Sequence, residues 1–150
     1  MKNRKYPRLK HYNYRSAGAY FLTLVCHQRR SLFGDIHLGI MIASPLGNIV
    51  ISAWNEVPRR TRFATLDTFA LMPNHFHAIL WLQERNERSL NQIINLFKGG
   101  VTRQAGYKIW QRSFYDRVIR NENELLHIRQ YIMDNAKRWE SDRLYIPGAH

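Results

Sequence analysis

The sequence predicts an α+β fold of the split βαβ type, ferredoxin-like or RRM-like, with a four- to five-stranded antiparallel sheet and helices on one face. Two observations predict this fold. Short β-branched and aromatic runs alternate with stretches of helical period, in the order strand, helix, strand, strand, helix, strand and closing helix. The chain also has 150 residues, 45% of them apolar, which suits one domain with one core. We therefore expect a single domain over residues 1–150.

The first part of the chain predicts a strand, a small hairpin and a helix. Residues 19–26, AYFLTLVC, are rich in the β-branched and aromatic side chains that strands favour. Residues 32–44 have two glycines between short apolar pieces, which indicates a hairpin. From residue 45 to about residue 60, apolar residues recur at every fourth position, which predicts a helix. These residues are Ile49, Ala53 and Val57.

The middle of the chain predicts a strand pair followed by a second helix. Residues 65–72 and 75–82 have strand composition, and Pro73 with Asn74 forms a tight turn between them. Ser89 followed by Gln92 is typical of a capping box that starts a helix. The apolar face of that helix consists of Leu90, Ile93, Ile94, Phe97 and Val101.

The last part of the chain predicts one more strand and a closing helix. Residues 108–119, KIWQRSFYDRVI, have strand-like composition. Residues 121–140 have a helical period, with Asn121 or Asn123 as the cap. The apolar stripe of this helix consists of Leu125, Ile128, Ile132, Ala136 and Trp139. A sheet with its two crossover helices on one face leaves the other face free for a ligand.

Basic residues outnumber acidic ones by 23 to 11, and much of the excess lies at the start of the chain. No acid precedes Asp35, and tyrosines alternate with the cations, which suits stacking on bases beside phosphate neutralisation. We expect this arm, residues 1–18, to bind nucleic acid; a solvated basic tail is the alternative. The candidate DNA contacts in it are Lys2, Arg4, Lys5, Arg8, Lys10 and Arg15.

The cysteine content and the hydropathy indicate the cellular compartment of the protein. Cys26 is the sole cysteine, so no intrachain disulfide can form, which fits a reducing environment. No apolar run reaches the roughly 18 residues that a spanning helix needs. We therefore expect a cytoplasmic protein with no membrane partner.

The segment MPNHFHAIL contains two histidines in a predicted strand. Because side chains alternate along a strand, His75 and His77 share one face while Phe76 points to the other. Two imidazoles that share a face can bind one metal ion, although a plain sheet surface is the alternative. A single cysteine excludes a zinc deaminase, and the chain has no H-E-x-x-H motif.

The closing helix offers a second pair of polar side chains. Tyr131 and Asn135 are four residues apart, so they share one helix face at the edge of the apolar stripe. This position allows a helix near the sheet to present a phenol and an amide oxygen together. An interfacial tyrosine with an asparagine near the helix end is the alternative.

Four segments of the chain, taken in order, resemble the single-tyrosine HUH transposases, and within them the REP-associated tyrosine transposases. The histidine, bulky hydrophobe, histidine signature matches HFH, and the tyrosine motif Y-I-x-x-N matches YIMDN. Members often continue this motif with N-P, whereas Ala136 follows here, so we expect the helix to continue through Trp139. The four segments are residues 12–34, 66–82, 89–103 and 109–139. The resemblance implies the metal ligands His75, His77 and Asn135 and the nucleophile Tyr131.

The resemblance also implies an activity and its partners. The expected reaction is cleavage and rejoining of single-stranded DNA beside a hairpin, a REP-like palindrome, through a 5′-phosphotyrosine link with Mg²⁺ or Mn²⁺. A monomer is favoured and a dimer is the alternative, in the bacterial cytoplasm and at the nucleoid when DNA is bound. The competing reading is a non-catalytic or domesticated protein that binds hairpin DNA or RNA on the same fold.

The segment before the closing helix has basic and aromatic side chains that could contact unpaired bases. An ordinary edge strand is the alternative. Tyr115 is also a competing nucleophile, ranked below Tyr131 because it lies in a predicted strand, away from the Y-I-x-x-N motif. The candidate DNA contacts in this segment are Trp110, Arg112, Tyr115 and Arg117.

Overall fold

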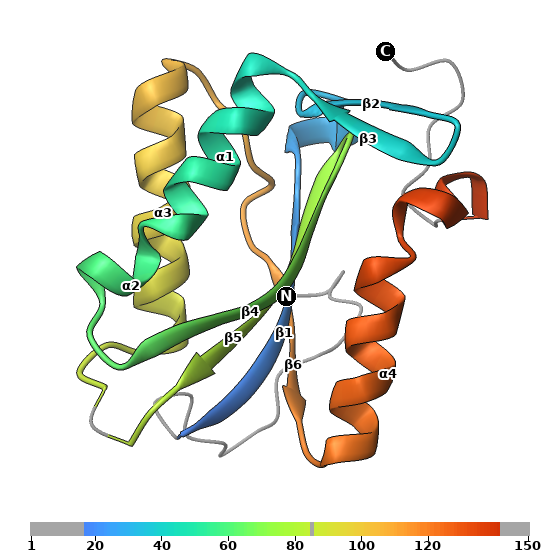
Figure 1. Cartoon of the computed structure of the whole chain (residues 1–150). Coiled ribbons are helices and arrows are strands. Elements are labelled where there is room, and N and C mark those ends of the chain that lie inside the picture. The colour runs from blue at the N-terminus through green and yellow to red at the C-terminus, as the bar shows by residue number, and fades with distance from the viewer. Residues whose placement is uncertain (1–16, 85, 142–150) are drawn as a thin grey trace.

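A four-stranded antiparallel sheet with the strand order β4-β5-β1-β6 lies at the centre of the fold (Figure 1). The computed structural model describes residues 17–141 except residue 85. The crossover helices between the strands and this strand order define the split βαβ fold, so the predicted fold class is confirmed. The strands are β1 (Gly18–Val25), β4 (Ala64–Met72), β5 (His75–Leu82) and β6 (Tyr115–Ile119).

A separate two-stranded sheet follows β1 and the short 3-10 turn η1 (His27–Arg29). Its strands are β2 (Gly34–His37) and β3 (Ile40–Ala43), which confirms the predicted hairpin. Gly34 has a φ of +144°, and a Cβ there would lie 2.1 Å from the carbonyl oxygen of Ile42, so only glycine fits.

Three helices lie on one face of the sheet: α1 (Pro45–Asn55), α2 (Val57–Arg60) and α3 (Leu90–Ala105). The capping box of α3 is confirmed, because Gln92 N donates to Ser89 Oγ at 3.2 Å and Ser89 N donates to Gln92 Oε1 at 2.9 Å. The helix predicted over residues 45–60 divides at Glu56, just before Pro58, whose ring nitrogen cannot donate to a helical carbonyl.

The main core lies between these helices and the sheet. Trp54 of α1 packs edge-on against Phe76 of β5 and Phe97 of α3, with ring centroids 5.3 and 5.2 Å apart. Phe76 therefore anchors the core, as its strand position predicts.

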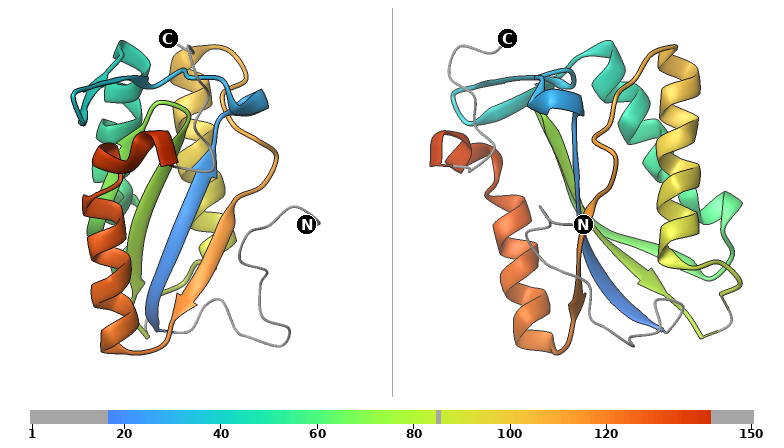
Figure 2. Two further views of the ribbon diagram at one scale, coloured as in Figure 1. Left: turned by 90° about the vertical axis from the view of Figure 1, so that its right-hand side faces the viewer. Right: turned by 180° about the vertical axis from the view of Figure 1, so that it is seen from behind.

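The opposite face of the sheet is covered by α4 (Glu122–Met133), so the expectation that this face stays open is wrong (Figure 2). Asn121 caps this helix, since its Oδ1 accepts from Glu124 N at 2.8 Å. A small apolar cluster joins helix and sheet, because the stripe of α4 must be buried against something. The buried members of this cluster are Ala19, Phe21, Ile79, Leu125 and Ile132.

The closing helix ends at Met133 and does not continue through Trp139. Residues 134 and 135 form a turn, and the 3-10 helix η2 (Ala136–Ser141) follows. Arg138 Nη2 donates to the carbonyl oxygen of Tyr131 at 3.1 Å, which satisfies an acceptor that the next helical turn would otherwise have used. The boundaries predicted for this helix, residues 121–140, are therefore wrong at the C-terminal end.

The strand predicted over residues 108–119 is also shorter than expected. Within this segment only the residues of β6 form a strand, which pairs with β1, and earlier in the segment Trp110 makes one isolated bridge to Cys26. The reason is packing, since the indole of Trp110 lies against Phe33 with ring centroids 5.3 Å apart.

Among the described residues, no helix combines the length and apolar character that crossing a membrane requires.

Candidate active site

Both histidines of β5 face α4, while Phe76 between them faces the main core. Their shared face is thus confirmed, but they are not exposed to solvent. The exposed fraction is 0% for His75 and 3% for His77, because α4 and the segment after it cover them. The two imidazole centroids lie 4.6 Å apart with ring planes at 75°.

Neighbouring polar side chains fix the orientation of both imidazoles through Nδ1. His75 Nδ1 lies 2.8 Å from Asn74 Oδ1, and the amide nitrogen of Asn74 donates to the carbonyl oxygen of Arg29. The Nδ1 of His75 is therefore the donor, which leaves Nε2 in the form that binds a metal. His77 Nδ1 lies 2.9 Å from the hydroxyl of Thr23, its partner across β1 and β5. Neither Asn74 nor Thr23 was predicted from the sequence as a partner of these histidines.

The helix α4 brings Tyr131 to the histidines. The Tyr131 and His77 ring centroids lie 5.6 Å apart, and the Phe21 ring lies 6.2 Å from the same phenol. The guanidinium carbon of Arg138 lies 4.9 Å from the centroid of the Tyr131 ring, as a cation over an aromatic face. The phenol is thus held between the sheet and an arginine that the sequence reasoning did not single out.

Asn135 lies in the turn after α4 and not on the helix itself. The prediction that Tyr131 and Asn135 share one helix face is therefore wrong. The turn nevertheless buries Asn135, with 2% of its surface exposed. The η2 helix that follows folds back so that Trp139 stacks on His75, with ring centroids 6.2 Å apart. Along the chain, Asn135 therefore lies between Tyr131, which contacts His77, and Trp139, which contacts His75.

The buried Oδ1 of Asn135 has no hydrogen-bond partner in the part of the chain that the structure describes. An unsatisfied buried acceptor costs about 1–3 kcal/mol, and a bound cation would offset that cost. Two imidazole nitrogens and one amide oxygen suit a divalent ion of the Mn²⁺ or Mg²⁺ kind. No group of three His, Cys, Asp or Glu side chains comes together within the described ranges. A metal held by described residues would therefore need a ligand of another kind, such as the amide oxygen of Asn135.

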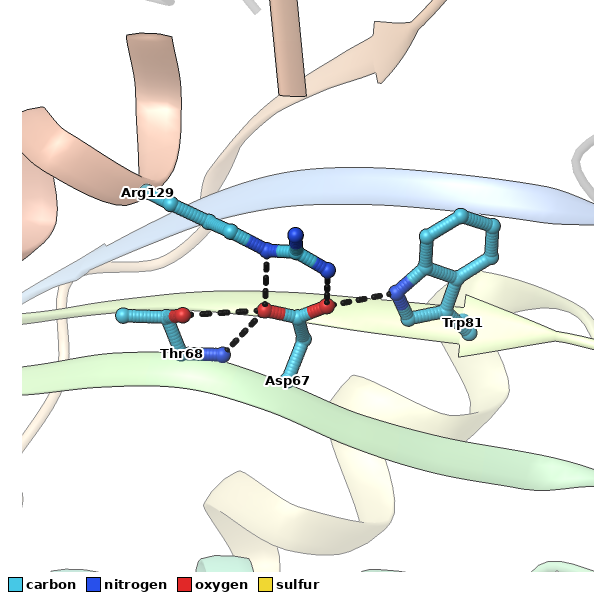
Figure 3. Close-up of polar contacts among 4 residues, drawn as sticks. All are labelled: Asp67, Thr68, Trp81 and Arg129. Atoms are coloured by element: carbon cyan, nitrogen blue, oxygen red, sulfur yellow. Dashed lines mark hydrogen bonds and ion pairs between the residues drawn. The ribbon is translucent and has the colours of Figure 1, made fainter. Parts of the chain in front are cut away.

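A second polar network, absent from the sequence-based prediction, joins α4 to the sheet (Figure 3). A bulge in β4 between Leu66 and Phe69 places Asp67 toward α4. Arg129 Nε and Nη2 donate to the two Asp67 oxygens at 3.0 and 2.7 Å, and Trp81 Nε1 donates at 2.8 Å. This network holds α4 in place two residues before Tyr131.

The charge of this network follows from the same contacts. The hydrogen bonds from Arg129 hold the pKa of Asp67 well below the usual carboxyl range, although partial burial opposes the shift. Asp67 is therefore ionised at neutral pH. A lone acid inside a strand is the sequence signal that could have indicated such a partner.

The candidate DNA contacts have different outcomes. The six basic residues of the N-terminal arm lie outside the described residues. Arg112 is exposed, whereas Arg117 forms an ion pair with Glu124 of α4, with Nη2 2.9 Å from Oε2. Trp110 is buried in the main core, so its expected role in stacking on bases is wrong.

Tyr115, the competing nucleophile, lies on the same face of the sheet as the histidines. It pairs with Thr23 across β1 and β6, and Thr23 pairs with His77 across β1 and β5. These three side chains therefore form one row across the sheet. The strand assignment of Tyr115 is confirmed, but Thr23 separates it from His77, whereas the Tyr131 ring contacts His77 directly.

Comparison with known proteins places this chain in a family. No family model matches it. An uncharacterized protein of Haemophilus influenzae is 35% identical over 96% of this chain and 94% of its own length, and the chain belongs to one family with that protein.

Two solved structures share the fold. A REP-associated tyrosine transposase bound to a REP hairpin matches with a TM-score of 0.69 and 23% identity, over 88% of this chain and 74% of that chain. A presumed transposase from Deinococcus radiodurans matches with a TM-score of 0.54 and 14% identity, over 85% of this chain and 96% of that chain. The chain therefore has the fold of the tyrosine transposases, as the sequence motifs predict.

Proposed function

We propose that this protein is a metal-dependent transposase that cuts and rejoins single-stranded DNA beside hairpins. The observation that carries the proposal is the meeting of two segments distant in sequence, β5 and the end of α4: the Tyr131 ring lies against His77 and Trp139 stacks on His75. Asn135 is buried in the turn between these two aromatic residues. A structural tyrosine on a surface helix would not need two buried imidazoles and an unsatisfied amide oxygen next to it.

The chemistry assigned to these residues is a phosphoryl transfer. The phenol oxygen of Tyr131 attacks a backbone phosphorus, the bond to the 3′ oxygen breaks, and the phenol proton leaves with the released 3′-hydroxyl, directly or through solvent. The 5′-phosphotyrosine link keeps the phosphodiester energy for rejoining. Arg138 fixes the ring from its outer face.

His75, His77 and Asn135 would hold the metal ion of this site. When bound, Mg²⁺ or Mn²⁺ would polarise the scissile phosphate and stabilise charge on the leaving oxygen. Because all three protein ligands are neutral, the ion would keep its full charge for the phosphate. Imidazole ligands suit Mn²⁺ better than Mg²⁺, so we expect higher activity with Mn²⁺.

The proposed partner is single-stranded DNA that carries a hairpin. Support comes from the fold shared with a transposase bound to a REP hairpin and from the net charge of +12. We assign hairpin binding to the basic arm of residues 1–18. Deletion of residues 1–15 should weaken hairpin binding and reduce its salt dependence; unchanged affinity would exclude this assignment.

We also propose a monomer in which α4 serves its own subunit, in the cytoplasm and on the nucleoid when DNA is bound. The packing of α4 on β4 and β5 of the same chain supports this arrangement. A dimer is the alternative.

The deciding experiment is incubation with a hairpin oligonucleotide labelled at its 3′ end, in the presence of Mn²⁺. The 5′-phosphotyrosine link keeps the labelled fragment on the protein, so a denaturing gel should show a labelled band. Tyr131→Phe should abolish that band and Tyr115→Phe should retain it. The reverse pattern would reassign the nucleophile, and hairpin binding without any adduct would indicate a domesticated binding protein.

A further inference from the structure

Residues of α1, α2 and α3 line a pocket of about 320 Å³. These three helices lie on the face of the sheet opposite α4 (Figure 1). The sheet separates this pocket from the histidines, so it is not part of the candidate active site. Its volume is at the lower end of the range for small-ligand sites, which suits a ligand of the size of one nucleotide.

One wall of the pocket is apolar. Val57 of α2 and the α3 residues Ile93 and Phe97 line it, and Leu96, with 43% of its surface exposed, stands at its edge. A leucine so exposed beside a concave apolar wall fits a site where a flat apolar group is inserted. Ser52, Thr61 and Gln104 add polar side chains that could bond to the edge of a base.

Two arginines from different helices converge over the rim of the pocket. Arg60 of α2 and Arg103 of α3 both reach Gly100, and a Cβ on Gly100 would lie 3.9 Å from Arg60 Nη1 and 3.9 Å from Arg103 Nη2. The two nitrogens are therefore separated by at most twice that distance. The absence of a side chain at Gly100 keeps this space open.

No acid neutralises these two guanidinium groups among the described residues. The acid of the pocket is Glu56, and Arg59 Nη1 lies 3.1 Å from its Oε1, so its charge is already compensated. Two like charges held together repel each other, and an anion between them would relieve the repulsion. Arginine pairs of this kind suit a phosphate, which can accept from both guanidinium groups.

We propose that this pocket binds one unpaired nucleotide of the DNA, with the base against the apolar wall and the phosphate between Arg60 and Arg103. This proposal rests on the proposed function in one respect, namely that the nucleotide belongs to DNA. The site would contact a part of the DNA distant from the phosphate that Tyr131 attacks, because the sheet lies between them.

The pocket can be closed by a substitution that does not weaken the fold. Glycine is less favourable in a helix interior than leucine, so Gly100→Leu should leave α3 as stable or more stable. Its side chain would fill the space between the two arginines. Gly99→Leu is the matched control, because Gly99 does not line the pocket and, of the residues that the structure describes, a Cβ there would meet only the end of the Arg103 side chain, with Nη1 at 3.5 Å.

The first measurement uses the full-length protein and thymidine 5′-monophosphate as the probe. The backbone amide signals of residues 99–104 are followed by NMR during titration with the nucleotide or with inorganic phosphate. We expect the nucleotide to shift these signals at concentrations at least about tenfold lower than phosphate does, and Gly100→Leu to remove the shift. No shift, or equal binding of phosphate alone, would overturn the proposal.

The second measurement uses hairpin DNA with one unpaired base and the same hairpin fully paired. We expect Gly100→Leu to reduce affinity for the first hairpin at least about fivefold and to leave the second unchanged, while Gly99→Leu changes neither. Arg60→Gln and Arg103→Gln should each lower the salt slope by roughly 0.7. Equal losses for both hairpins would overturn the proposal.

These outcomes separate the two proposals. If the nucleotide binds at Gly100 but no covalent adduct forms on Tyr131, the pocket proposal stands and the transposase proposal is excluded. If the covalent adduct forms on Tyr131 and Gly100→Leu binds DNA as the wild type does, the transposase proposal stands and the pocket proposal is excluded.

Discussion

The two faces of the central sheet are covered in different ways. One face packs against α1 and α3 through large apolar side chains, among them Trp54, Phe76 and Phe97. The other face packs against α4 through a small apolar cluster, and its buried surface includes two imidazoles and an amide. Burial of polar groups lowers stability unless they are paired, so the first face supports the fold, whereas the second face gives up stability to hold the residues of the proposed active site.

The largest effect on the free energy of unfolding should come from a substitution on the first face. Trp54→Ala removes a fully buried indole from contact with Phe76 and Phe97, and such truncations cost about 3–5 kcal/mol. The free energy of unfolding, measured in urea, should fall by that amount. Leu126→Ala, at an exposed position of α4, is the control and should change it by less than about 0.5 kcal/mol. A loss below 1 kcal/mol for Trp54→Ala would remove the contrast between the faces.

A smaller effect should come from the ion pair that holds α4. Asp67→Asn removes the charge that binds Arg129, and we expect a loss of about 1–2 kcal/mol, since the side chain of Arg129 is 36% exposed and solvent screens part of the interaction. Adduct formation should also fall, because α4 positions Tyr131. Glu124→Gln, at the more exposed pair with Arg117, should cost about 0–1 kcal/mol.

The same ion pair should make stability depend on pH. Arg129 holds the pKa of folded Asp67 well below the ordinary value, so the folded state binds this proton less readily than the unfolded chain. The contribution is present above about pH 5 and is lost as the pH falls toward the folded pKa. The pH profile of the unfolding free energy should therefore be flatter in Asp67→Asn, and equal profiles would contradict this account.

The smallest effect on stability should come from Asn135. Asn135→Ala removes a buried oxygen that has no hydrogen-bond partner in the described chain, so stability without metal should change by less than about 1 kcal/mol, in either direction. Added Mn²⁺ should raise the Tm of the wild type and not that of the variant. Asn95→Ala, at an exposed position of α3, should retain the Mn²⁺ effect. An equal rise in Asn135→Ala would exclude this residue as a ligand.

The sequence predicted well the features that local rules determine. The hairpin of β4 and β5, the capping box at Ser89 and the shared face of His75 and His77 follow from composition, hydrogen-bonding side chains and strand alternation over a few residues. Each of them is confirmed because no distant contact overrides the local preference.

The remaining features depend on contacts between distant segments. Arg129 meets Asp67 across 62 positions of the chain, and Asp67 lies in the bulge of β4, where the regular alternation of strand faces is interrupted. The end of α4 depends on Arg138, which takes the carbonyl of Tyr131 out of the helical pattern. Strand composition gave no sign that Trp110 would turn into the core. These contacts are tertiary, so neither periodicity nor spacing could predict them.

The connection between β6 and α4 consists only of Arg120 and Asn121. So short a link gives the helix little freedom to swing away and insert into another copy of the protein, because the end of β6 would have to unpair first. A mixture of two inactive variants, Tyr131→Phe and His75→Ala, should therefore not regain activity. For the same reason, the rate per molecule should not change when the protein is diluted.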